Sequence, residues 1–490
     1  MPDQTDFYAR LGLSPDATEE DIRKAYRAAA RKLHPDVNSK DGATELFINM
    51  KEAFEALIDP RQRAAYDEKR PTPPPPPVRL NKVFSRDTLS ALDAPQLIYA
   101  LIELDILVDA SKTDDNTPIN LTLVLDCSTS MKGERLDQVK VTAIELLQRL
   151  RPQDIISIIS FNDRAEVLIP AGPRPAPHKA ESRIRMMQAR GSTQIYDGLN
   201  AGYIQAQQFL RPEYSNHLLL VTDGHTYGDE AACIALANQA ADAGIVISTL
   251  GIGSDWNDKF LDQVAKATGG SSVFVSSPKD IGAFFKEKLE YLGKSFVERV
   301  EMNLRLAPNV KLTYAFRLTP EVGALPTEMP VHLGGIPYQS RQRILLEFLV
   351  DPLPEDISRV VLAEGRFSFT IPTYSTNKYR LPITLLRPVS NDGHIEPPPH
   401  SIVEAMSKLT LYRMQEKVQD NVTHRNFEAA AQGLQNMATH LLAQGELDLA
   451  KTALLEVHNI RKQQQLSQEG QKQIKYGTRA LLLPSGNPKG

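Results

Sequence analysis

Two stretches near the N-terminus have apolar residues at helical spacing. The apolar stripe of the first is formed by Ile22, Ala25, Tyr26, Ala29 and Leu33. Its other faces carry Arg23, Lys24, Arg27, Arg31 and Lys32. Thr18 followed by Asp21 resembles a capping box, so we expect this helix to begin near Glu19. A second helix is expected from Thr44 to Leu57. The two would form an antiparallel hairpin with His34-Pro35-Asp36 at its tip, because Pro35 disfavours helix in the residue before it.

The middle of the chain alternates short apolar strands with helical patterns. The predicted strands are Leu121–Leu125, Ile155–Phe161, Leu218–Thr222 and Ile245–Leu250. The predicted helices are Lys132–Leu150, Tyr196–Leu210, Glu230–Ala243, Asp258–Ala267 and Pro278–Leu292. This alternation indicates a doubly wound α/β domain, a parallel sheet covered by helices on both faces.

After this domain, apolar and polar residues alternate with a period of two in several short stretches. Strands are predicted at Glu298–Arg305, Lys311–Phe316, Arg343–Val350, Val360–Phe369 and Lys378–Leu386. Such short strands with Pro and Gly between them are typical of a β-sandwich. The stretch Pro95–Val108 reads as a further strand that lies before the α/β domain. We therefore expect the α/β domain to be inserted in the sandwich, with strands supplied from both sides.

The C-terminal part returns to helical spacing from about Pro399 to Leu466, which favours a small antiparallel bundle. The segment Lys475–Pro484 is apolar and basic. We expect it to dock as a strand on the sandwich or the bundle. The alternative is a peptide motif around Thr478 that another protein binds, with or without phosphorylation.

Composition restricts the class of protein. The chain has 490 residues, 41% hydrophobic and 24% charged, which is typical of a soluble multidomain protein. A net charge of -4 gives no support for nucleic acid as the main partner. Two cysteines are too few for a disulfide framework or zinc modules. The N-terminus lacks a signal-peptide pattern and no apolar run is long enough to span a bilayer, so we expect a cytoplasmic protein.

Several spaced motifs accompany His34-Pro35-Asp36. They are Asp6-Phe-Tyr-Ala-Arg-Leu-Gly-Leu13, Ala25-Tyr26, Lys32-Leu-His-Pro-Asp36, Lys51-Glu-Ala-Phe54 and Arg63-Ala-Ala-Tyr-Asp67. Together they resemble a J domain over roughly residues 5–70. The resemblance implies that the basic helix docks on a DnaK-type chaperone and that the tip triggers its ATP hydrolysis. The implied chaperone-binding residues are His34, Pro35, Asp36, Arg23, Lys24, Arg27, Arg31 and Lys32. The alternative is that His34 caps a helix and the basic run is a solvated face.

Oxygen-bearing side chains follow two of the predicted strands. Asp126 and Asp223 come directly after strands, so they would project at the same sheet edge, where sites form in such folds. The candidate ligands are Asp126, Ser128, Ser130, Thr193 and Asp223. Two carboxylates and three hydroxyls suit Mg²⁺ or another hard divalent cation. The hydroxyls add no negative charge, so the ion could accept an acidic group of a partner as its last ligand.

These residues resemble the metal-ion-dependent adhesion site of von Willebrand factor A domains. The matching segments are Asp126-Cys-Ser128-Thr-Ser130, Gly191-Ser-Thr193-Gln-Ile-Tyr-Asp-Gly-Leu199 and Val221-Thr-Asp223-Gly224. The resemblance spans about residues 118–294 and implies that the five candidate ligands hold the metal. The alternative is a metal-free domain in which the serines cap a helix and Asp223 ends a strand.

The expected organisation has seven parts. They are a J domain (1–70), a proline-rich linker (71–80), N-terminal sandwich strands (81–117), an A domain (118–294), the rest of the sandwich (295–392), a helical bundle (393–470) and a tail (471–490). The linker replaces the zinc-binding and Gly/Phe-rich regions of other J proteins, so we expect the A domain to select the partner.

Three functional hypotheses follow. The first is a co-chaperone adaptor that stimulates a DnaK-type chaperone and binds a protein partner through Mg²⁺. The second is a metal-dependent scaffold whose J domain is regulatory or inactive. The third is a metal-dependent enzyme. We expect no enzyme, because the metal-site motifs supply no nucleophile–base pair and His225 is the one nearby candidate base.

Overall fold

The computed structural model describes residues 7–33 except 12 and 14–16, and residues 43–69, 77–107, 117–390 and 397–482. Within 117–390 it omits 225–227, 254–255, 339, 355 and 374–377. The chain forms two compact units. The first comprises Met1–Pro76 with Thr373–Tyr379, and the second comprises Pro77–Pro372 with Arg380–Gly490.

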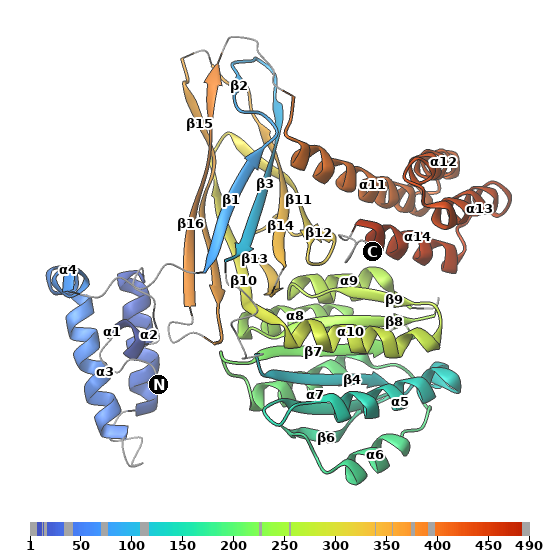
Figure 1. The fold of residues 1–490 in the computed structure, drawn as a ribbon, viewed down its shortest axis with the longest axis horizontal. Coiled ribbons are helices and arrows are strands. Elements are labelled where there is room, and N and C mark those ends of the chain that lie inside the picture. The colour runs from blue at the N-terminus through green and yellow to red at the C-terminus, as the bar shows by residue number, and fades with distance from the viewer. Residues whose placement is uncertain are drawn as a thin grey trace. The chain divides into compact units, whose positions relative to one another are not determined.

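The first unit is helical around a small core. Its helices are α1 (Phe7–Arg10), α2 (Glu19–Leu33), α3 (Ala43–Ile58) and α4 (Pro60–Lys69) (Figure 1). The predicted capping box is confirmed: the Thr18 amide donates to Asp21 Oδ2 at 2.9 Å and the Asp21 amide to Thr18 Oγ1 at 3.2 Å. Tyr26 of α2 stacks on Phe54 of α3 with ring centroids 4.1 Å apart. The apolar stripe of α2 therefore packs inward and leaves its basic face outward.

The α/β domain contains the predicted sheet. Its strand order is β6-β5-β4-β7-β8-β9. The strands are β4 (Ile119–Asp126), β5 (Ile155–Phe161), β6 (Ala165–Pro173), β7 (Ser215–Thr222), β8 (Val246–Ile252) and β9 (Ser272–Val275). Five strands are parallel, while β6 pairs antiparallel with β5 and forms one edge. All eight residues of β4 are buried, because helices cover both faces of this central strand.

Seven α-helices and two short 3₁₀ turns surround the described strands of this sheet. They are η2 (Thr129–Met131), α5 (Glu134–Arg149), α6 (Pro177–Arg185), α7 (Ile195–Gln208), α8 (Glu230–Ala243), α9 (Asp258–Ala267), η3 (Pro278–Asp280) and α10 (Ile281–Gly293), with α14 (Gln468–Leu482) packed against α9 from the C-terminus. The predicted helices are confirmed, whereas β6, β9 and α6 were not anticipated. Residues of β6 and α6 line a groove next to Cys127, which follows the candidate ligand Asp126.

The β-sandwich is built from both sides of the α/β domain, as predicted. One sheet has the order β1-β3-β14-β11-β12 and the other β13-β10-β15-β16-β2. Three strands precede the α/β domain: β1 (Val78–Phe84), β2 (Leu89–Ser90) and β3 (Gln96–Ile106). The others follow it: β10 (Ser295–Leu306), β11 (Val310–Thr319), β12 (Gly323–Leu325), β13 (Val331–Pro337), β14 (Arg341–Val350), β15 (Arg359–Thr370) and β16 (Lys378–Ser390). The register places Ile102 of β3 opposite Ile344 of β14.

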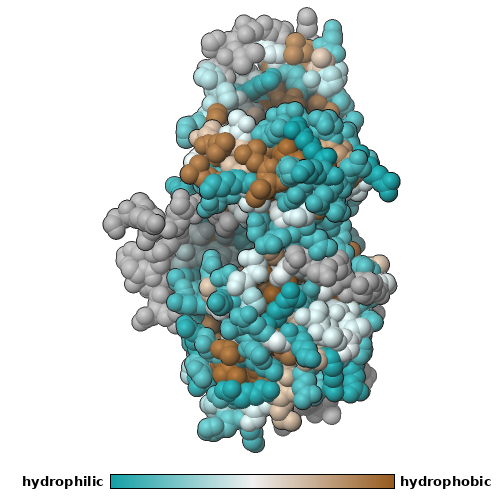
Figure 2. All heavy atoms as spheres, turned by 90° about the vertical axis from the view of Figure 1, so that its right-hand side faces the viewer, coloured by the Kyte–Doolittle hydropathy of each residue, from teal (hydrophilic) through white to brown (hydrophobic). Residues whose placement is uncertain are grey.

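The C-terminal region continues with α11 (His400–Thr423), α12 (Phe427–Ala443), α13 (Leu447–Gln463) and α14. Figure 2 shows the side of the molecule that lies on the right in Figure 1, with an apolar patch over α12 and α13 in the upper half of the view. The exposed leucines of these helices are Leu442 of α12 and Leu447, Leu454 and Leu455 of α13. Within the described residues, no helix is long and apolar enough to cross a bilayer.

The prediction of a docking strand at Lys475–Pro484 was wrong, because residues up to Leu482 belong to helix α14. Residues 483–490 lie outside the described part of the chain. The polar side chains of α14 face inward: Lys475 Nζ lies 2.9 Å from Asp262 Oδ2 of α9, and Arg479 forms two hydrogen bonds to the same carboxylate. Thr478 is fully buried, so a partner cannot reach it in this fold. The boundary expected between residues 470 and 471 falls inside this helix.

Candidate functional site

The first loop of the site begins where β4 ends. Asp126 is fully buried, and its Oδ1 accepts a hydrogen bond from the Ser128 amide at 2.7 Å. Its Oδ2 accepts one from Thr222 Oγ1, at the end of the neighbouring strand β7, at 2.6 Å. A backbone donor in the loop after β4 and a side-chain donor on β7 therefore orient this carboxylate at the carboxyl edge of the sheet.

The third loop approaches the first through its own carboxylate. Asp223 follows β7 directly and is buried. Ser130 Oγ donates to Asp223 Oδ1 at 2.6 Å, and the hydroxyls of Ser128 and Ser130 hydrogen-bond at 2.9 Å. Oxygen atoms of Ser128, Ser130 and Asp223 are thus linked by hydrogen bonds, and Asp126 joins this group through the Ser128 amide.

The second loop supplies Thr193, which is buried just before α7. A Cβ atom placed on Gly224 would lie 3.1 Å from Thr193 Oγ1 and 3.8 Å from Ser130 Oγ. The hydroxyl of Thr193 therefore borders the same small space as that of Ser130. This space exists because residue 224 has no side chain.

The second loop is tied to the first by backbone contacts. The Thr129 amide and hydroxyl both donate to the Gly191 carbonyl, at 3.1 and 2.9 Å. Gly191 has φ +74°, and a Cβ there would overlap the carboxylate of Asp163. Asp163 in turn accepts hydrogen bonds from the amide and hydroxyl of Ser192. A glycine at residue 191 lets the loop approach closely enough to present Thr193.

Burial raises the pKa of Asp126 to about 6, since its charged form loses hydration. Hydrogen bonds from Thr222 and Ser128 act in the opposite direction, and the charge of Asp223 adds to the increase. Two buried carboxylates at one sheet edge favour a cation between or beside them.

The donor set fits a hard divalent cation. Its two carboxylates and three hydroxyls are all oxygen ligands, and the Gly224 cradle leaves room beside them. Within the described residues, no group of three or more His, Cys, Asp or Glu side chains is placed to hold a metal. A cation at this edge would therefore depend on the hydroxyls, with Asp126 and Asp223 supplying the negative charge.

The sequence reasoning missed one charged member of the site. Arg135 Nη1 lies 2.5 Å from Asp223 Oδ2, and its side chain is 36% exposed. Arg135 sits in the first turn of α5, where the helix dipole disfavours a positive charge. The sequence signal that could have identified it is a basic residue close after Ser128 and Ser130, at a helix start where a positive charge is favourable only beside a carboxylate.

The candidate chaperone-binding face is described in part. Arg23, Lys24 and Arg27 are exposed on α2, and Arg23 pairs with Glu19 one turn earlier. Arg31 and Lys32 lie in α2, but their side chains are outside the described set, as are His34, Pro35 and Asp36. The described part is a basic, solvent-facing helix surface.

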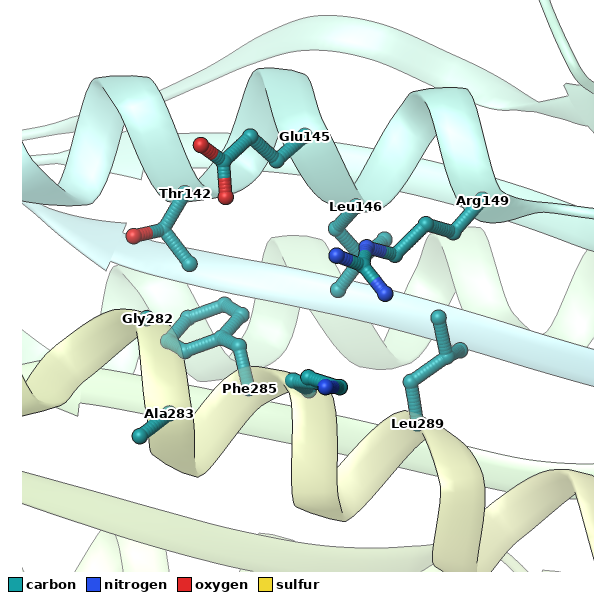
Figure 3. Close-up of a pocket in the computed structure, with 9 residues that line it drawn as sticks. Thr142, Glu145, Leu146, Arg149, Gly282, Ala283, Phe285 and Leu289 are labelled. Carbon is teal, nitrogen blue, oxygen red and sulfur yellow. The ribbon is translucent and has the colours of Figure 1, made fainter.

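A separate cavity of about 200 Å³ lies between α5 and α10. Figure 3 shows Phe285 and Leu289 of α10 facing Leu146 of α5, with Glu145 and Arg149 among the lining residues. None of the five candidate ligands lines it. It is a gap between two packed helices and lies apart from the oxygen cluster.

Comparison with known proteins identifies three regions. Residues 6–67 match the model of the DnaJ domain, residues 120–287 that of the von Willebrand factor type A domain, and residues 400–484 the Sll0103-like, C-terminal alpha-helical domain. The two resemblances drawn from the motifs are thereby confirmed. The third match spans helices α11 to α14.

Two relatives illustrate these matches. The uncharacterized protein sll0103 of Synechocystis is 30% identical over 256 residues, which cover 50% of this chain and 61% of that protein. The chaperone protein DnaJ of Streptococcus agalactiae is 50% identical over 64 residues, 13% of this chain and 17% of that protein. The chain thus spans less than two thirds of either relative.

Two solved structures share the fold. A von Willebrand factor type A protein from Catenulispora acidiphila aligns with a TM-score of 0.66 at 12% identity, covering 82% of this chain and 96% of its own. The ArnB paralog VWA2 from Sulfolobus acidocaldarius aligns with a TM-score of 0.55 at 13% identity, covering 82% and 98%. At these identities the likeness concerns the fold alone.

Proposed function

We propose that this chain, which joins a DnaJ domain to a von Willebrand factor type A domain, is a co-chaperone adaptor. Its J domain recruits a DnaK-type chaperone and stimulates ATP hydrolysis by that chaperone. Its A domain binds a protein partner through Mg²⁺ or another divalent cation. The protein would bring chaperone activity to whatever the A domain binds.

The grouping of Asp126, Ser130 and Asp223 at one sheet edge carries the metal-dependent part of the proposal. When bound, the cation would supply an electrophilic centre for a partner's carboxylate. The protein's own residues hold the two buried carboxylates apart from water and orient the hydroxyls. The exposed Ser130 lies where a partner could reach the site.

The exposed basic face of α2 supports the chaperone-directed part. Arg23, Lys24 and Arg27 point to solvent from a helix whose start is fixed by the Thr18–Asp21 capping box. A rigid basic helix attracts an acidic surface and speeds encounter with it in a salt-dependent manner. His34, Pro35 and Asp36 would then act on the docked chaperone.

The chaperone's ATPase rate tests this part. The full chain should accelerate ATP hydrolysis by a DnaK-type chaperone, and His34→Gln should abolish the acceleration. Lys451→Gln, at an exposed position of α13, is the matched control and should stimulate like the unmodified chain. Equal stimulation by the unmodified chain and His34→Gln would overturn the chaperone-directed role.

Affinity capture with Mg²⁺ or with a chelator tests the metal-dependent part. Partners retained with Mg²⁺ should be lost with chelator and with Asp126→Ala. If the same partners remain in all three conditions, the A domain works without metal. If capture is metal-dependent but the chaperone does not respond, the second hypothesis applies, a scaffold with a regulatory or inactive J domain.

The proposal also covers chemistry and location. DnaJ and von Willebrand factor A domains are typically non-catalytic interaction modules, and we propose no enzymatic activity for this chain. Its candidate base His225 lies outside the described residues. Cys127 and Cys233 are buried free thiols, which is consistent with the reducing cytoplasm that we propose as its location.

A further inference from the structure

A groove of about 510 Å³ lies beside the candidate metal site, between β6 and α6. Its walls include Cys127, Glu166 and Val167 on one side and Arg183, Met186 and Arg190 on the other. Cys127 follows the ligand Asp126, and Arg190 precedes the loop that presents Thr193. One end of the groove therefore adjoins the metal-site loops.

This connection is rigid. The Arg190 amide donates to the Cys127 carbonyl at 2.8 Å, and the next residue, Gly191, accepts two hydrogen bonds from Thr129. A chain that placed a carboxylate on the metal would have its neighbouring residues at the mouth of the groove. The groove is thus placed to contact the flanks of a metal-bound acidic residue.

Two arginines, Arg183 and Arg190, line the groove, and the segment that carries them is basic. Residues 174–190 contain five Arg or Lys residues and a single acidic residue, although the whole chain has a net charge of -4. That acid, Glu181, pairs with Arg185 at 3.9 Å. Arg190 is exposed, and within the described residues no ion pair or side-chain hydrogen bond engages its guanidinium. A partner's carboxylate can therefore reach it without displacing another group.

The groove also exposes apolar surface. Met186 is 77% exposed and Val167 is 39% exposed. Methionine adapts its shape to varied side chains, so it suits a surface that accepts more than one apolar residue. Glu166, on the wall opposite Arg190, gives the groove one acidic group that would disfavour a ligand with acids on both sides.

Among the strands that the structure describes, β6 is an edge strand of the sheet and pairs only with β5. The Leu168 carbonyl on this strand accepts a hydrogen bond from Arg183 Nη1 at 2.7 Å. An extended segment can lie along such an edge with its side chains in the adjoining groove. An extended chain, unlike a helix, can pair its backbone with an edge strand, here at the backbone groups of β6 other than the Leu168 carbonyl.

We propose that the groove between β6 and α6 binds an extended acidic segment of a protein partner, next to the residue whose carboxylate coordinates the metal. Arg190 contacts a flanking carboxylate, and Met186 with Val167 contacts an apolar side chain. This inference rests on the proposed metal-dependent binding and specifies the sequence of its partner.

A displayed library of short random peptides is the probe. Selection on the full chain with Mg²⁺ should enrich peptides in which one Asp or Glu is flanked by further acidic and apolar residues. Selection on Arg190→Glu should still require Mg²⁺ but should lose the flanking acids. Arg211→Glu is the matched control and should select like the unmodified chain, because exposed Arg211 precedes β7 and lies toward the amino ends of the parallel strands, away from the candidate ligands at their carboxyl ends.

Affinity then gives the quantitative test. A peptide selected on the unmodified chain should bind Arg190→Glu roughly tenfold or more weakly, and bind Arg211→Glu unchanged. Retained thermal stabilisation by Mg²⁺ would show that Arg190→Glu keeps its fold. If Arg190→Glu and Arg211→Glu select peptides with the same flanking residues and bind them with the same affinity, the proposed role of the groove is wrong. The proposed metal site would be unaffected by that result. If no peptide is enriched in a Mg²⁺-dependent manner, the proposed metal-dependent binding fails, and the groove with it.

Discussion

Arg135 and Asp223 form an ion pair, with Nη1 2.5 Å from Oδ2, at the edge of the sheet where the candidate metal ligands converge. The other oxygen of Asp223 accepts the Ser130 hydroxyl. A guanidinium thus already neutralises one of the two carboxylates on which a divalent cation depends. Arg135 and the cation would compete for the same negative charge.

We therefore predict that Arg135→Gln raises the affinity for Mg²⁺. A unit positive charge and a divalent ion would repel by about 1–2 kcal/mol at a separation of about 5 Å, even at the dielectric constant of water, and the substitution would remove this repulsion. The expected gain is roughly tenfold in the dissociation constant, measured by isothermal titration calorimetry.

Arg149→Gln is the control for this change. It removes the same charge from the other end of α5, about 21 Å along the helix at 1.5 Å per residue, well beyond the screening length at physiological salt. Its Mg²⁺ affinity should equal that of the unmodified chain. Weaker binding by Arg135→Gln would mean that Arg135 orients Asp223 for the metal.

Mg²⁺ should stabilise the A domain. A ligand that binds only the folded state at a hundred times its dissociation constant adds about 2.7 kcal/mol to the free energy of unfolding. The midpoint of A-domain unfolding in a thermal scan should therefore rise with Mg²⁺ and fall on adding chelator. Asp126→Ala should lose this response, while Asp242→Ala, at an exposed position of α8, should keep it. A full response in Asp126→Ala would show that the ion binds elsewhere.

The capping box of α2 should hold the start of the basic helix. Thr18→Ala removes the hydroxyl that accepts the Asp21 amide, and losing such a cap costs about 1 kcal/mol. Amide hydrogen exchange in the first turn of α2 should accelerate roughly fivefold at that cost. Thr18→Ser retains a hydroxyl and should exchange like the unmodified chain. Equal protection in Thr18→Ala would mean that packing alone maintains this end of the helix.

Local sequence patterns were enough to predict the structure where a run of apolar residues is also buried. Leu121–Leu125 of β4 are apolar apart from Thr122 and are all buried, so their sequence identified a buried strand, and Asp126 after them identified the candidate site. The candidate ligands could be grouped from sequence because parallel strands bring Asp126 and Asp223 to one edge. Arg135 escaped notice because its partner lies 88 residues further along the chain.

Helix α14 was misjudged for a related reason. Lys472, Lys475 and Arg479 recur at helical spacing, but on the buried face, where hydrophobic periodicity predicts apolar residues. Their partners belong to the α/β domain: Lys472 Nζ donates to the Trp256 carbonyl at 2.9 Å, and Arg479 binds Asp262, 217 residues earlier. A polar interface between segments so distant in sequence has no local signature.

This polar interface should nevertheless strongly stabilise the packing of α14 against α9. Asp262 is buried and faces both Lys475 and Arg479. Asp262→Ala leaves two buried cations without this partner, and breaking a buried ion pair in this way costs about 3–5 kcal/mol. Hydrogen exchange in α14 should report that loss. Asp448→Ala, which breaks the fully exposed pair with Lys451, should leave the protection of α14 unchanged.

The same interface should weaken in acid. Burial raises the pKa of Asp262, but the charges of Arg479 and Lys475 outweigh burial and hold it well below its usual range. A carboxyl whose pKa is lower in the folded state contributes stability above its unfolded pKa of about 3.9, and this contribution is lost as the pH falls below that value. The difference in α14 protection between the unmodified chain and Asp262→Asn should therefore be largest near neutral pH and narrow below pH of about 4. A difference that does not change with pH would show that the carboxylate's charge is not what holds α14 against α9.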